Sequence, residues 1–485
     1  MPRLRPCRER EPFDPGATDP GDTRPTATRP ATRAPTRANY HGLAMMQRID
    51  LRELQPNRAD LARLIPRAQT DVAAASAIAA DLIDDVRVRG EEALLDQAER
   101  LDGVRPAAIR VHNGEIAAAV RLLPVAVRDA LEEAIARVTV ATRAQLPAPT
   151  VTTIAPGAEV IQRWQPVNRA GFYVPGGKAV YPSSVVMNVV PAQVAGVSSI
   201  ALASPAQRQF DGAVHPTILG AAGLMGVEEV YAMGGAGAIG ALAYGVPSLS
   251  LDPVQVITGP GNVYVAAAKR QVRGVAGIDS EASPTEILII ADATANPTYV
   301  AADLISQAEH DELAAALLVT DSPELADAVD TEVARLAALT HHGERVREAL
   351  AGRQSAIVLV ADLPSAAAFS NAYGPEHLEI QTAESGLVLD LIESAGAIFL
   401  GENSPVSLGD YLAGSNHVLP TGGQARFAPG LGAYTFLRPQ QVINYSRDAL
   451  AAVEARIVAL STAEDLPAHG DAVTVRFAAN PEASE

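Results

Sequence analysis

Residues 286–320 read EILIIADATANPTYVAADLISQAEHDELAAALLVT. Two short β-like runs, EILIIAD and LAAALLVT, flank a helical pattern in ADLISQAEHDEL. A strand, a helix and a second strand in this order form the repeating unit of a parallel α/β sheet. Further β-like runs, separated by helical segments, occur on both sides of this stretch, namely RAGFYVPGG, SSIALASP, EEVYAM, SAIVLV and GAIFLG. Their number predicts two parallel sheets rather than one.

The composition of the 485-residue chain bounds its class. The chain is longer than one hydrophobic core usually serves and is 48% hydrophobic, so we expect more than one domain. Aromatic residues are few and alanine is abundant, which favours helix-rich α/β packing. A formal net charge of −18 repels phosphate backbones, so we expect no nucleic-acid partner. Because the sequence has no long, uncharged apolar run, we also expect no membrane span.

The first 45 residues differ from the rest in composition. Pro, Thr, Arg and Ala recur in TRPTATRPATRAPTRA without the apolar periodicity that builds a core, which predicts a disordered extension. A targeting peptide is the alternative, but the segment has no apolar h-region and contains scattered Asp and Glu. The break in composition favours translation from Met45 or Met46. The single cysteine, Cys7, lies in this extension, so no disulfide framework is expected and a reducing compartment is compatible.

Apolar residues at i, i+3 and i+4 predict helices from Ile49 to about Leu146 and again from about Leu437. With the β-like runs, this pattern predicts two Rossmann-like α/β domains with parallel sheets and small N- and C-terminal helical arms. The expected division is a disordered extension (1–45), the helical part of the first domain (46–172), the second domain (173–284), the remainder of the first domain (285–431) and a C-terminal helical arm (432–485).

Polar side chains at helical spacing indicate a metal site. Gln307 and His310 are three residues apart on the predicted helix, so an amide oxygen and an imidazole nitrogen can meet on one face. Two later segments, SLGDYLAGSNHVLP and AEDLPAHG, carry further ligand-type residues, namely Asp410, His417, Glu464 and His469. Nitrogen and oxygen donors without thiolate suit Zn²⁺ or a similar borderline cation.

The adjacent pair Glu376 and His377 in NAYGPEHLEIQT is the strongest catalytic candidate. A carboxylate beside an imidazole can supply two separate proton-transfer groups, each adjustable toward neutral pH by its surroundings. An isolated histidine is ordinarily structural, but the flanking acid sets this one apart. The preceding Gly-Pro favours a turn that presents both residues at a loop or at the start of a helix.

Glycine-rich turns follow several predicted strands. Pro175-Gly176-Gly177 and Gly259-Pro260-Gly261 come where open α/β sheets place their ligands. The run EEVYAMGGAGAIG also holds a GxGxxG spacing, at Gly235, Gly237 and Gly240. This spacing is typical of a dinucleotide fingerprint, although the nearest acid, Asp252, comes earlier than the ribose-binding acid should. Close packing of a helix through small residues is the alternative.

Six segments, in this order along the chain, resemble the histidinol dehydrogenase family: GFYVPGGKAVYPSSVVMN, ITGPGNVYVAAAKRQV, DLISQAEHDE, EHLEIQT, SPVSLGDYLAGSNHVLPTGG and TAEDLPAHG. The resemblance runs from about Ile49 to about Phe477. It implies a cytoplasmic, zinc-dependent, NAD-linked four-electron oxidation of L-histidinol through L-histidinaldehyde to L-histidine. It also implies an intertwined homodimer in which the C-terminal arm reaches the active site of the partner.

The resemblance further implies a role for each matching residue. His377 would be the general base and Glu376 would activate the water that adds to the aldehyde. The zinc ligands would be Gln307, His310, Asp410 and His469. Together with these four and His377, the residues lining the substrate pocket would be Thr285, His417 and Glu464. The positions that contact NAD would be Tyr173, Gly237 and Asn262.

Three positions depart from the family pattern. Gly237 stands where the family commonly has Gln, Ser283 stands where glycine is usual, and Gly374 replaces a more common Ala. The sequence leaves NAD and NADP both open, because no ribose-binding acid or 2′-phosphate-binding arginine can be assigned. A dehydrogenase of the same fold that oxidises another polar alcohol is the alternative function, and a non-redox zinc protein is a further one.

Overall fold

The computed structural model describes residues 45–54, 58–68, 72–176, 180–281 and 284–478. The predicted disordered extension, apart from Met45, lies outside the described residues, as do Gly177 and Ser283. No helix in these ranges is both long and apolar enough to cross a membrane.

Six parallel strands form the first sheet, in the spatial order β1-β11-β10-β9-β12-β13. The strands are β1 (Gln47–Asp50), β9 (Glu286–Ala291), β10 (Ala315–Thr320), β11 (Ala356–Leu359), β12 (His377–Gln381) and β13 (Ala397–Leu400). From β9 the chain adds β10 and β11 on one side, and it then returns to place β12 and β13 on the other side. The topological switch point of this sheet therefore lies between β9 and β12.

The second sheet has five parallel strands in the order β6-β5-β4-β7-β8. They are β4 (Arg169–Tyr173), β5 (Ser199–Ser204), β6 (Glu229–Ala232), β7 (Val256–Thr258) and β8 (Gly277–Ile278). The chain again moves outward, from β4 to β5 and β6, before it returns to β7 and β8, so the switch point lies between β4 and β7. All seven β-like runs of the sequence are strands of these two sheets, and the prediction of two parallel sheets is confirmed.

Helices cover both faces of each sheet. In β9, Ile287 and Ile289 belong to one apolar cluster, and Leu288 and Ile290 belong to the cluster on the opposite face. A strand buried on both faces needs a continuous apolar run, which is what the sequence EILIIA supplies. The helices around the first sheet are α1 (Arg58–Leu64), α10 (Pro297–Ala308), α11 (Pro323–Ala337), α12 (Gly343–Ala351), α13 (Leu363–Tyr373), α14 (Ser385–Leu389) and α15 (Val406–Tyr411).

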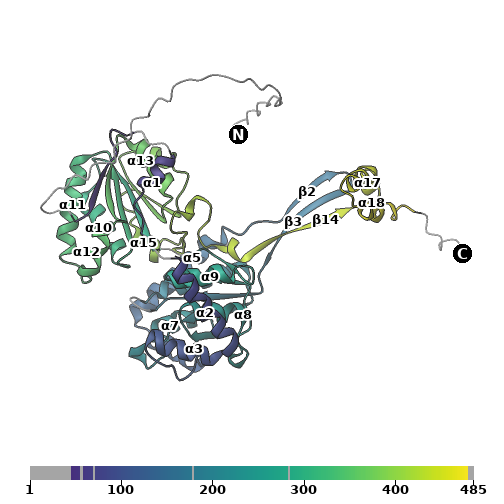
Figure 1. Ribbon diagram of the computed structural model, residues 1–485, viewed down its shortest axis with the longest axis horizontal. Helices are drawn as coiled ribbons and strands as arrows, with labels where there is room; N and C mark the ends of the chain where they lie inside the picture. The colour runs from purple at the N-terminus through teal and green to yellow at the C-terminus, as the bar shows by residue number, and fades with distance from the viewer. Residues whose placement is uncertain (1–44, 55–57, 69–71, 177–179, 282–283, 479–485) are drawn as a thin grey trace, which may run out of the picture. The chain divides into compact units, whose positions relative to one another are not determined.

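The helices that follow β1 and α1 pack against the second sheet. Helix α2 packs against α8 and α9 (Figure 1), α4 against α7 and α5 against α6. We expected residues 46–172 to belong to the first domain. Within the described part of this range, β1, α1 and Arg67 join it, through β11, α13 and Glu286, whereas α2, α4 and α5 pack against helices of the second domain. The helices around the second sheet are α2 (Val72–Arg89), α3 (Glu91–Gln97), the π-helix η1 (Ala98–Asp102), α4 (Asn113–Leu122), α5 (Val125–Arg143), α6 (Pro182–Ala195), α7 (Pro216–Leu224), α8 (Gly235–Tyr244) and α9 (Val263–Val272).

A third, antiparallel sheet joins two distant parts of the chain in the order β14-β3-β2 (Figure 1). Its strands are β2 (Thr150–Ala155), β3 (Ala158–Pro166) and β14 (Leu437–Tyr445). The sequence predicted helix from about Leu437, and this was wrong for β14, whose partner lies about 280 residues earlier in the chain. Helix does follow the strand, as α16 (Arg447–Ala451), α17 (Glu454–Ala463) and α18 (Pro467–Thr474).

Candidate active site

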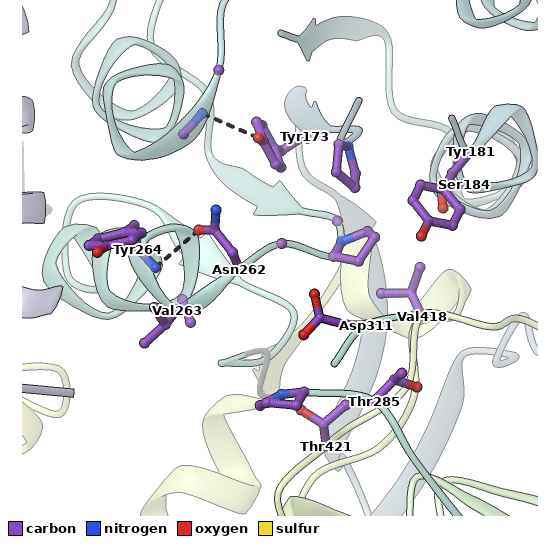
Figure 2. Close-up of a pocket in the computed structure, with 18 of the residues that line it drawn as sticks. Tyr173, Tyr181, Ser184, Asn262, Val263, Tyr264, Thr285, Asp311, Val418 and Thr421 are labelled. Carbon is purple, nitrogen blue, oxygen red and sulfur yellow. Dashed lines mark hydrogen bonds between the residues drawn. The ribbon is translucent and has the colours of Figure 1, made fainter. Parts of the chain in front are cut away.

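A cavity of about 1080 Å³ is lined by residues of both parallel sheets (Figure 2). From the second sheet come Tyr173 and residues 259–262, at the carboxyl ends of β4 and β7. From the first sheet come Thr285, Glu376 and His377, at the amino ends of β9 and β12. The cavity thus lies at the switch point of the second sheet only. Its volume exceeds the roughly 300–1,000 Å³ of most small-molecule pockets, so it has room for a substrate and a dinucleotide together.

Glu376 and His377 are held by the neighbouring strand β9. His377 pairs with Ile287 in the sheet, which places the pair beside the main chain of Glu286. The Glu286 N–H donates to Oε2 of Glu376 (2.9 Å), and Nδ1 of His377 lies 3.1 Å from the Glu286 carbonyl oxygen. A carbonyl oxygen only accepts, so Nδ1 carries the proton and Nε2 is free to take one.

Burial sets the protonation of both groups. It lowers the pKa of His377, against the opposing effect of Asp410, so the imidazole is neutral near pH 7. It raises the pKa of Glu376 to about 8, although Thr285 and the Glu286 N–H favour the carboxylate. Nδ1 of His377 and Oε2 of Glu376 are 3.7 Å apart, but these shifts favour two neutral groups rather than an ion pair. Both can therefore exchange protons near neutral pH.

The predicted location is right for one residue of the pair and wrong for the other. We predicted a loop or the start of a helix; Glu376 lies in the loop before β12, whereas His377 is the first residue of that strand. The strand reads HLEIQ, and its buried Glu379 and Gln381 break the continuous apolar pattern of its neighbours. A single-sequence reading of β propensity misses such a strand because polar residues are ordinarily rare in it.

The side chain of Glu286 anchors this wall of the cavity. It is 3% exposed and accepts hydrogen bonds from Nη1 of Arg67 (2.8 Å) and from the Tyr373 hydroxyl (2.9 Å). The Arg67 guanidinium also lies over the Tyr373 ring, 4.0 Å from its centroid, and donates to the Tyr373 carbonyl. These contacts fix the main chain of Glu286, and through it Glu376 and His377. Sequence reasoning missed Glu286 because its role depends on strand register.

Thr285 links Glu376 to the predicted metal ligand Gln307. The Thr285 hydroxyl donates to Oε2 of Glu376 (2.6 Å) and accepts from Nε2 of Gln307 (2.7 Å). Oε1 of Gln307 is then buried and has no hydrogen-bond partner among the described residues. An unpartnered buried acceptor is costly, so this oxygen is available to a ligand.

His310 lies just beyond α10, which ends at Ala308. The main-chain N–H of His310 donates to the Gln307 carbonyl (3.3 Å), so the helical turn continues. This turn keeps Gln307 and His310, the two predicted ligands, close to each other. Nδ1 of His310 is 3.2 Å from the Ser306 carbonyl oxygen, so Nε2 is the ring nitrogen that remains for a ligand. His310 lines the cavity, whereas Gln307 reaches this wall through Thr285.

Asp410 and His417 complete this end of the cavity. Asp410 is on α15. Nδ1 of His417 lies 3.0 Å from the main-chain carbonyl oxygen of Asp410 and 3.9 Å from the Asp410 carboxylate. Nε2 of His417 is 3.0 Å from the Ser184 hydroxyl. Both ring nitrogens of His417 are therefore engaged within the chain, and burial lowers its pKa. These contacts favour a pocket-lining role for His417 and leave the Asp410 carboxylate as the donor on this side.

The wall expected to bind the cofactor is built around residues 259–262. The Asn262 side chain caps α9 by accepting from the N–H groups of Tyr264 and Val265 (3.1 and 3.2 Å; Figure 2). Gly259 has φ +124°, and a Cβ there would overlap the Tyr173 carbonyl. A buried ion pair that the sequence analysis did not identify, Lys269 with Asp279, binds both main-chain polar groups of Gly259. Only glycine fits this turn.

The GxGxxG segment packs against helices. It follows β6, the edge strand of the second sheet, and not β4, the first strand. A Cβ at Gly237 would overlap Oε1 of Gln97, and one at Gly240 would lie 3.2 Å from the Cα of Ile83. Gly237 does not line the cavity, whereas Gln97 does. These contacts favour the packing interpretation of the motif over the dinucleotide interpretation.

Glu464 and His469 are not brought to the cavity within one chain. Glu464 follows α17 and His469 is on α18, and both side chains are exposed. In the part of the chain that the structure describes, no three His, Cys, Asp or Glu side chains converge as a metal centre would need. The predicted ligands that lie near one another in one chain are Gln307, His310 and Asp410, of which one is an amide.

Comparison with known proteins shows the family of the chain. The family model for histidinol dehydrogenase matches residues 65–477. A histidinol dehydrogenase of Leifsonia xyli subsp. xyli is 72% identical over 432 residues, which cover 89% of this chain and 99% of that protein. One of Thermobifida fusca is 56% identical over 434 residues, or 90% of this chain and 98% of that protein.

A crystal structure gives the same result for the fold. The histidinol dehydrogenase of Elizabethkingia anophelis matches with a TM-score of 0.83 at 32% identity, over 90% of this chain and 99% of that one. The family match thus spans the second sheet, the first sheet apart from β1, and all of the residues that line the cavity. The chain therefore belongs to the histidinol dehydrogenase family and is an oxidoreductase of histidine biosynthesis.

Proposed function

We propose that this enzyme oxidises L-histidinol to L-histidine in two NAD-linked steps, through L-histidinaldehyde, with a zinc ion in its active site. The observation that carries the proposal is the pair Glu376 and His377, two buried proton-transfer groups on one wall of a cavity that reaches the β4–β7 switch point. An alcohol needs one base to become an aldehyde, whereas an aldehyde must also gain water before it can become an acid. Two such groups therefore favour two successive oxidations over a single one.

The donors near the pair fit zinc. Oε1 of Gln307 is buried without a partner among the described residues, Nδ1 but not Nε2 of His310 faces the Ser306 carbonyl, and the Asp410 carboxylate lies on the cavity wall. These nitrogen and oxygen atoms are ligand types that zinc accepts. Together with His469 of the partner subunit, these three residues would hold the ion. When bound, zinc would hold the imidazole and amine of the substrate, and it carries no electrons because Zn²⁺ has no accessible redox change.

His377 acts as the base in both oxidations. Its Nδ1–H is fixed by the Glu286 carbonyl, so Nε2 takes the hydroxyl proton of the alcohol as hydride leaves the carbinol carbon. Bound NAD⁺ supplies the hydride acceptor. The imidazolium then releases this proton to solvent, so that in the second oxidation Nε2 can take a hydroxyl proton of the aldehyde hydrate in the same way. The lowered pKa of His377 keeps the imidazole neutral for this role.

Glu376 acts between the two oxidations. Its pKa of about 8 makes the carboxylate a strong enough base to take a proton from the water that adds to the aldehyde. Thr285 and the Glu286 N–H both bind Oε2, so they orient the carboxylate and keep part of it ionised. Because Glu376 and His377 share one cavity, the reactive aldehyde need not leave between the steps.

The proposed assembly is a homodimer in the cytoplasm. Large apolar side chains of the antiparallel sheet, Val151, Ile154 and Ile443, are each more than half exposed. Exposed apolar groups gathered on one element are typical of a protein–protein interface. Glu464 and His469 follow this sheet in the chain and are exposed, as residues that reach a second subunit would be.

A substrate comparison tests the proposed reaction. With zinc and NAD⁺ present, kcat/KM should favour L-histidinol over an amino alcohol without imidazole, such as L-leucinol, by at least about 100-fold. Similar values for both alcohols would support the alternative function, a dehydrogenase for another polar alcohol. Absence of NADH with every alcohol would contradict an NAD-linked oxidation altogether.

Mixing inactive variants tests the shared site. His377→Ala and His469→Ala should each be inactive, and after subunit exchange the mixture should regain about one quarter of wild-type activity, because half of the dimers then hold one intact site. A sample of His377→Ala mixed with itself is the control. No regained activity, with exchange verified, would mean that each site is built within one chain.

A further inference from the structure

Asp102 is an acid on the cavity wall that the proposed chemistry does not use. It is the last residue of the π-helix η1 and lines the cavity. A Cβ built on Gly234 would lie 3.2 Å from Oδ2 of Asp102 and 2.9 Å from the Cβ of Pro205. Gly234 caps α8 after β6, and Pro205 follows β5. The carboxylate therefore lies beyond the carboxyl ends of β5 and β6.

The strand order gives this position a meaning. In a doubly wound sheet a dinucleotide lies across the switch point, and an acid beside the strands that follow the first one binds the ribose hydroxyls of its adenosine half. The first strand here is β4, and β5 and β6 follow it on one side. The segment between β5 and α7 reads PAQRQFDGAVH, and its one acid, Asp211, does not line the cavity. Asp102, from a segment that precedes the sheet, supplies a carboxylate at this place.

The carboxylate of Asp102 has no partner of its own. No described residue donates a hydrogen bond to it, and burial alone raises its pKa to about 6. The nearby Arg208 donates from Nε to the main-chain oxygen of Asp102 (3.1 Å), not to the carboxylate. A partly buried, unpartnered carboxylate is costly to keep, which favours a role in binding.

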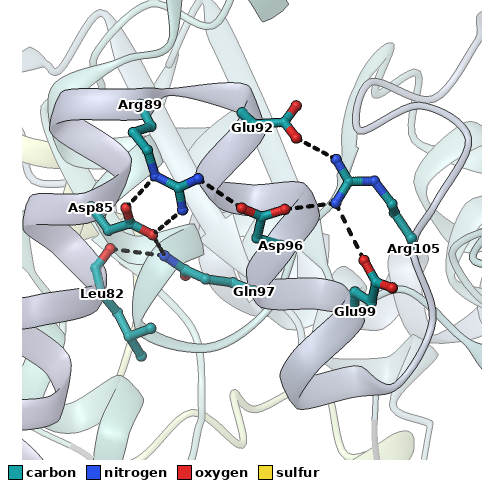
Figure 3. Close-up of polar contacts among 8 residues, drawn as sticks. All are labelled: Leu82, Asp85, Arg89, Glu92, Asp96, Gln97, Glu99 and Arg105. Carbon is teal, nitrogen blue, oxygen red and sulfur yellow. Dashed lines mark hydrogen bonds and ion pairs between the residues drawn. The ribbon is translucent and has the colours of Figure 1, made fainter.

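Gln97 also lines this wall, but its acceptor is not free for a ligand. It is 5% exposed and uses Nε2 for the Leu82 carbonyl (3.1 Å) and for Oδ2 of Asp85 (3.3 Å; Figure 3). Its Oε1 has no hydrogen-bond partner among the described residues and is buried against Gly237, which does not line the cavity. The acceptor that this wall offers is therefore the Asp102 carboxylate. A carboxylate suits the hydroxyl groups of a ribose and repels a phosphate.

We propose that Asp102 accepts hydrogen bonds from the adenosine ribose hydroxyls of the dinucleotide and excludes a 2′-phosphate, and so selects NAD over NADP. This rests on the proposed function, in which a nicotinamide dinucleotide binds at the β4–β7 switch point. Asp102 is then a specificity-determining residue that lies away from the reacting atoms. The sequence did not reveal it, because the expected acid should follow the glycine motif and this one precedes it by more than 130 residues.

Direct binding of the reduced cofactors tests the assignment. NADH and NADPH are titrated into the zinc-loaded, full-length enzyme and followed by their own fluorescence, for wild type, Asp102→Asn and Asp102→Ala. Glu99→Gln is the matched control, since Glu99 is on the same π-helix but is exposed and paired with Arg105. Wild type should bind NADH at least about 10-fold more tightly than NADPH, the fold-change expected for hydrogen bonds to a charged acceptor. Both Asp102 variants should bind NADH about 10-fold more weakly than wild type does. Their affinities for NADH and NADPH should then lie within about threefold of each other.

Four results would overturn the proposal. Equal binding of NADH and NADPH by wild type, or an unchanged preference in folded Asp102 variants, would remove Asp102 as the selector and leave the proposed function standing. A similar loss in Glu99→Gln would mean that η1 acts only through its structure. Binding of neither cofactor by wild type would overturn the proposed function together with this inference. Circular dichroism of the variants shows that they are folded.

Discussion

Replacing Thr285 by Val tests how the proton-transfer pair and the metal site are coupled. The change removes one hydroxyl from a position where the two side chains have nearly the same shape. Two hydrogen bonds are lost, one to the charged form of Glu376 and one from the amide of Gln307. Bonds to charged groups contribute about 1.5–3 kcal/mol and bonds between neutral groups about 0.5–1.5 kcal/mol.

The loss at Glu376 converts into a pKa. About 1.4 kcal/mol corresponds to one pKa unit, so the pKa of Glu376 should rise by at least about one unit from its value of about 8. At pH 7 the ionised fraction would fall from about one tenth to about one hundredth, and oxidation of the aldehyde should slow by about 10-fold. The loss at Gln307 frees the side chain that presents Oε1, so zinc affinity should fall by about 10- to 100-fold.

Two assays separate these effects. Oxidation of L-histidinaldehyde at saturating zinc, followed from pH 6 to 9.5, should show the Thr285→Val deficit shrinking as the pH rises, because more of Glu376 then ionises. Competition with a chelator gives the zinc affinity. Thr285→Ser keeps the hydroxyl and should resemble wild type in both assays. If Thr285→Val stays within about twofold of Thr285→Ser in rate and in zinc affinity, the proposed coupling is wrong.

Three further changes probe the packing and the buried charges. Gly237→Ala should lower the free energy of unfolding in urea by about 1–3 kcal/mol, because the new Cβ overlaps Gln97. Adding Gln97→Ala should recover part of that loss. Equal losses in the single and double variants would contradict the contact between the two residues. The pKa of Asp102 is raised from 3.8 to about 6, so its ionised form destabilises the fold, an effect that is absent below about pH 4 and complete above about pH 6. Asp102→Asn should therefore be more stable than wild type by about 1–2 kcal/mol at pH 7, after allowance for screening, and no different at pH 4; a variant that is less stable at pH 7 would contradict this. Lys269→Met leaves Asp279 buried without its cation, so the free energy of unfolding, measured by thermal denaturation, should fall by about 3–5 kcal/mol. A loss below about 1 kcal/mol would contradict this.

The parallel sheets could be predicted because their strands are continuous apolar runs. The sequence EILIIA of β9 is buried on both faces, and such a run has few other uses in a chain of this composition. Strand β14 could not be predicted, because it contains Pro439 and several polar residues and exists only through its pairing with β3. Local sequence carries no signal for a partner so far away in the chain.

The site divides in the same way. Glu376, His377, Gln307 and His310 could be proposed as site residues from the sequence, because their chemistry shows in adjacent or helically spaced residues. Asp102 and Glu286 could not be proposed in this way. Each lies beside a segment about 90 to 130 residues away in the chain, through the register of strands and the packing of helices. The departure at Gly237 also gains an explanation, since Gln97 fills the space that a side chain there would need.

The stoichiometry of NADH formation tests the central claim that one cavity performs both oxidations. A limiting, known amount of L-histidinol is converted to completion with excess NAD⁺ and zinc, NADH is measured by absorbance, and the product is identified by mass. The account predicts two NADH and one L-histidine for each L-histidinol, with no free aldehyde. One NADH for each L-histidinol, with L-histidinaldehyde accumulating, would contradict it.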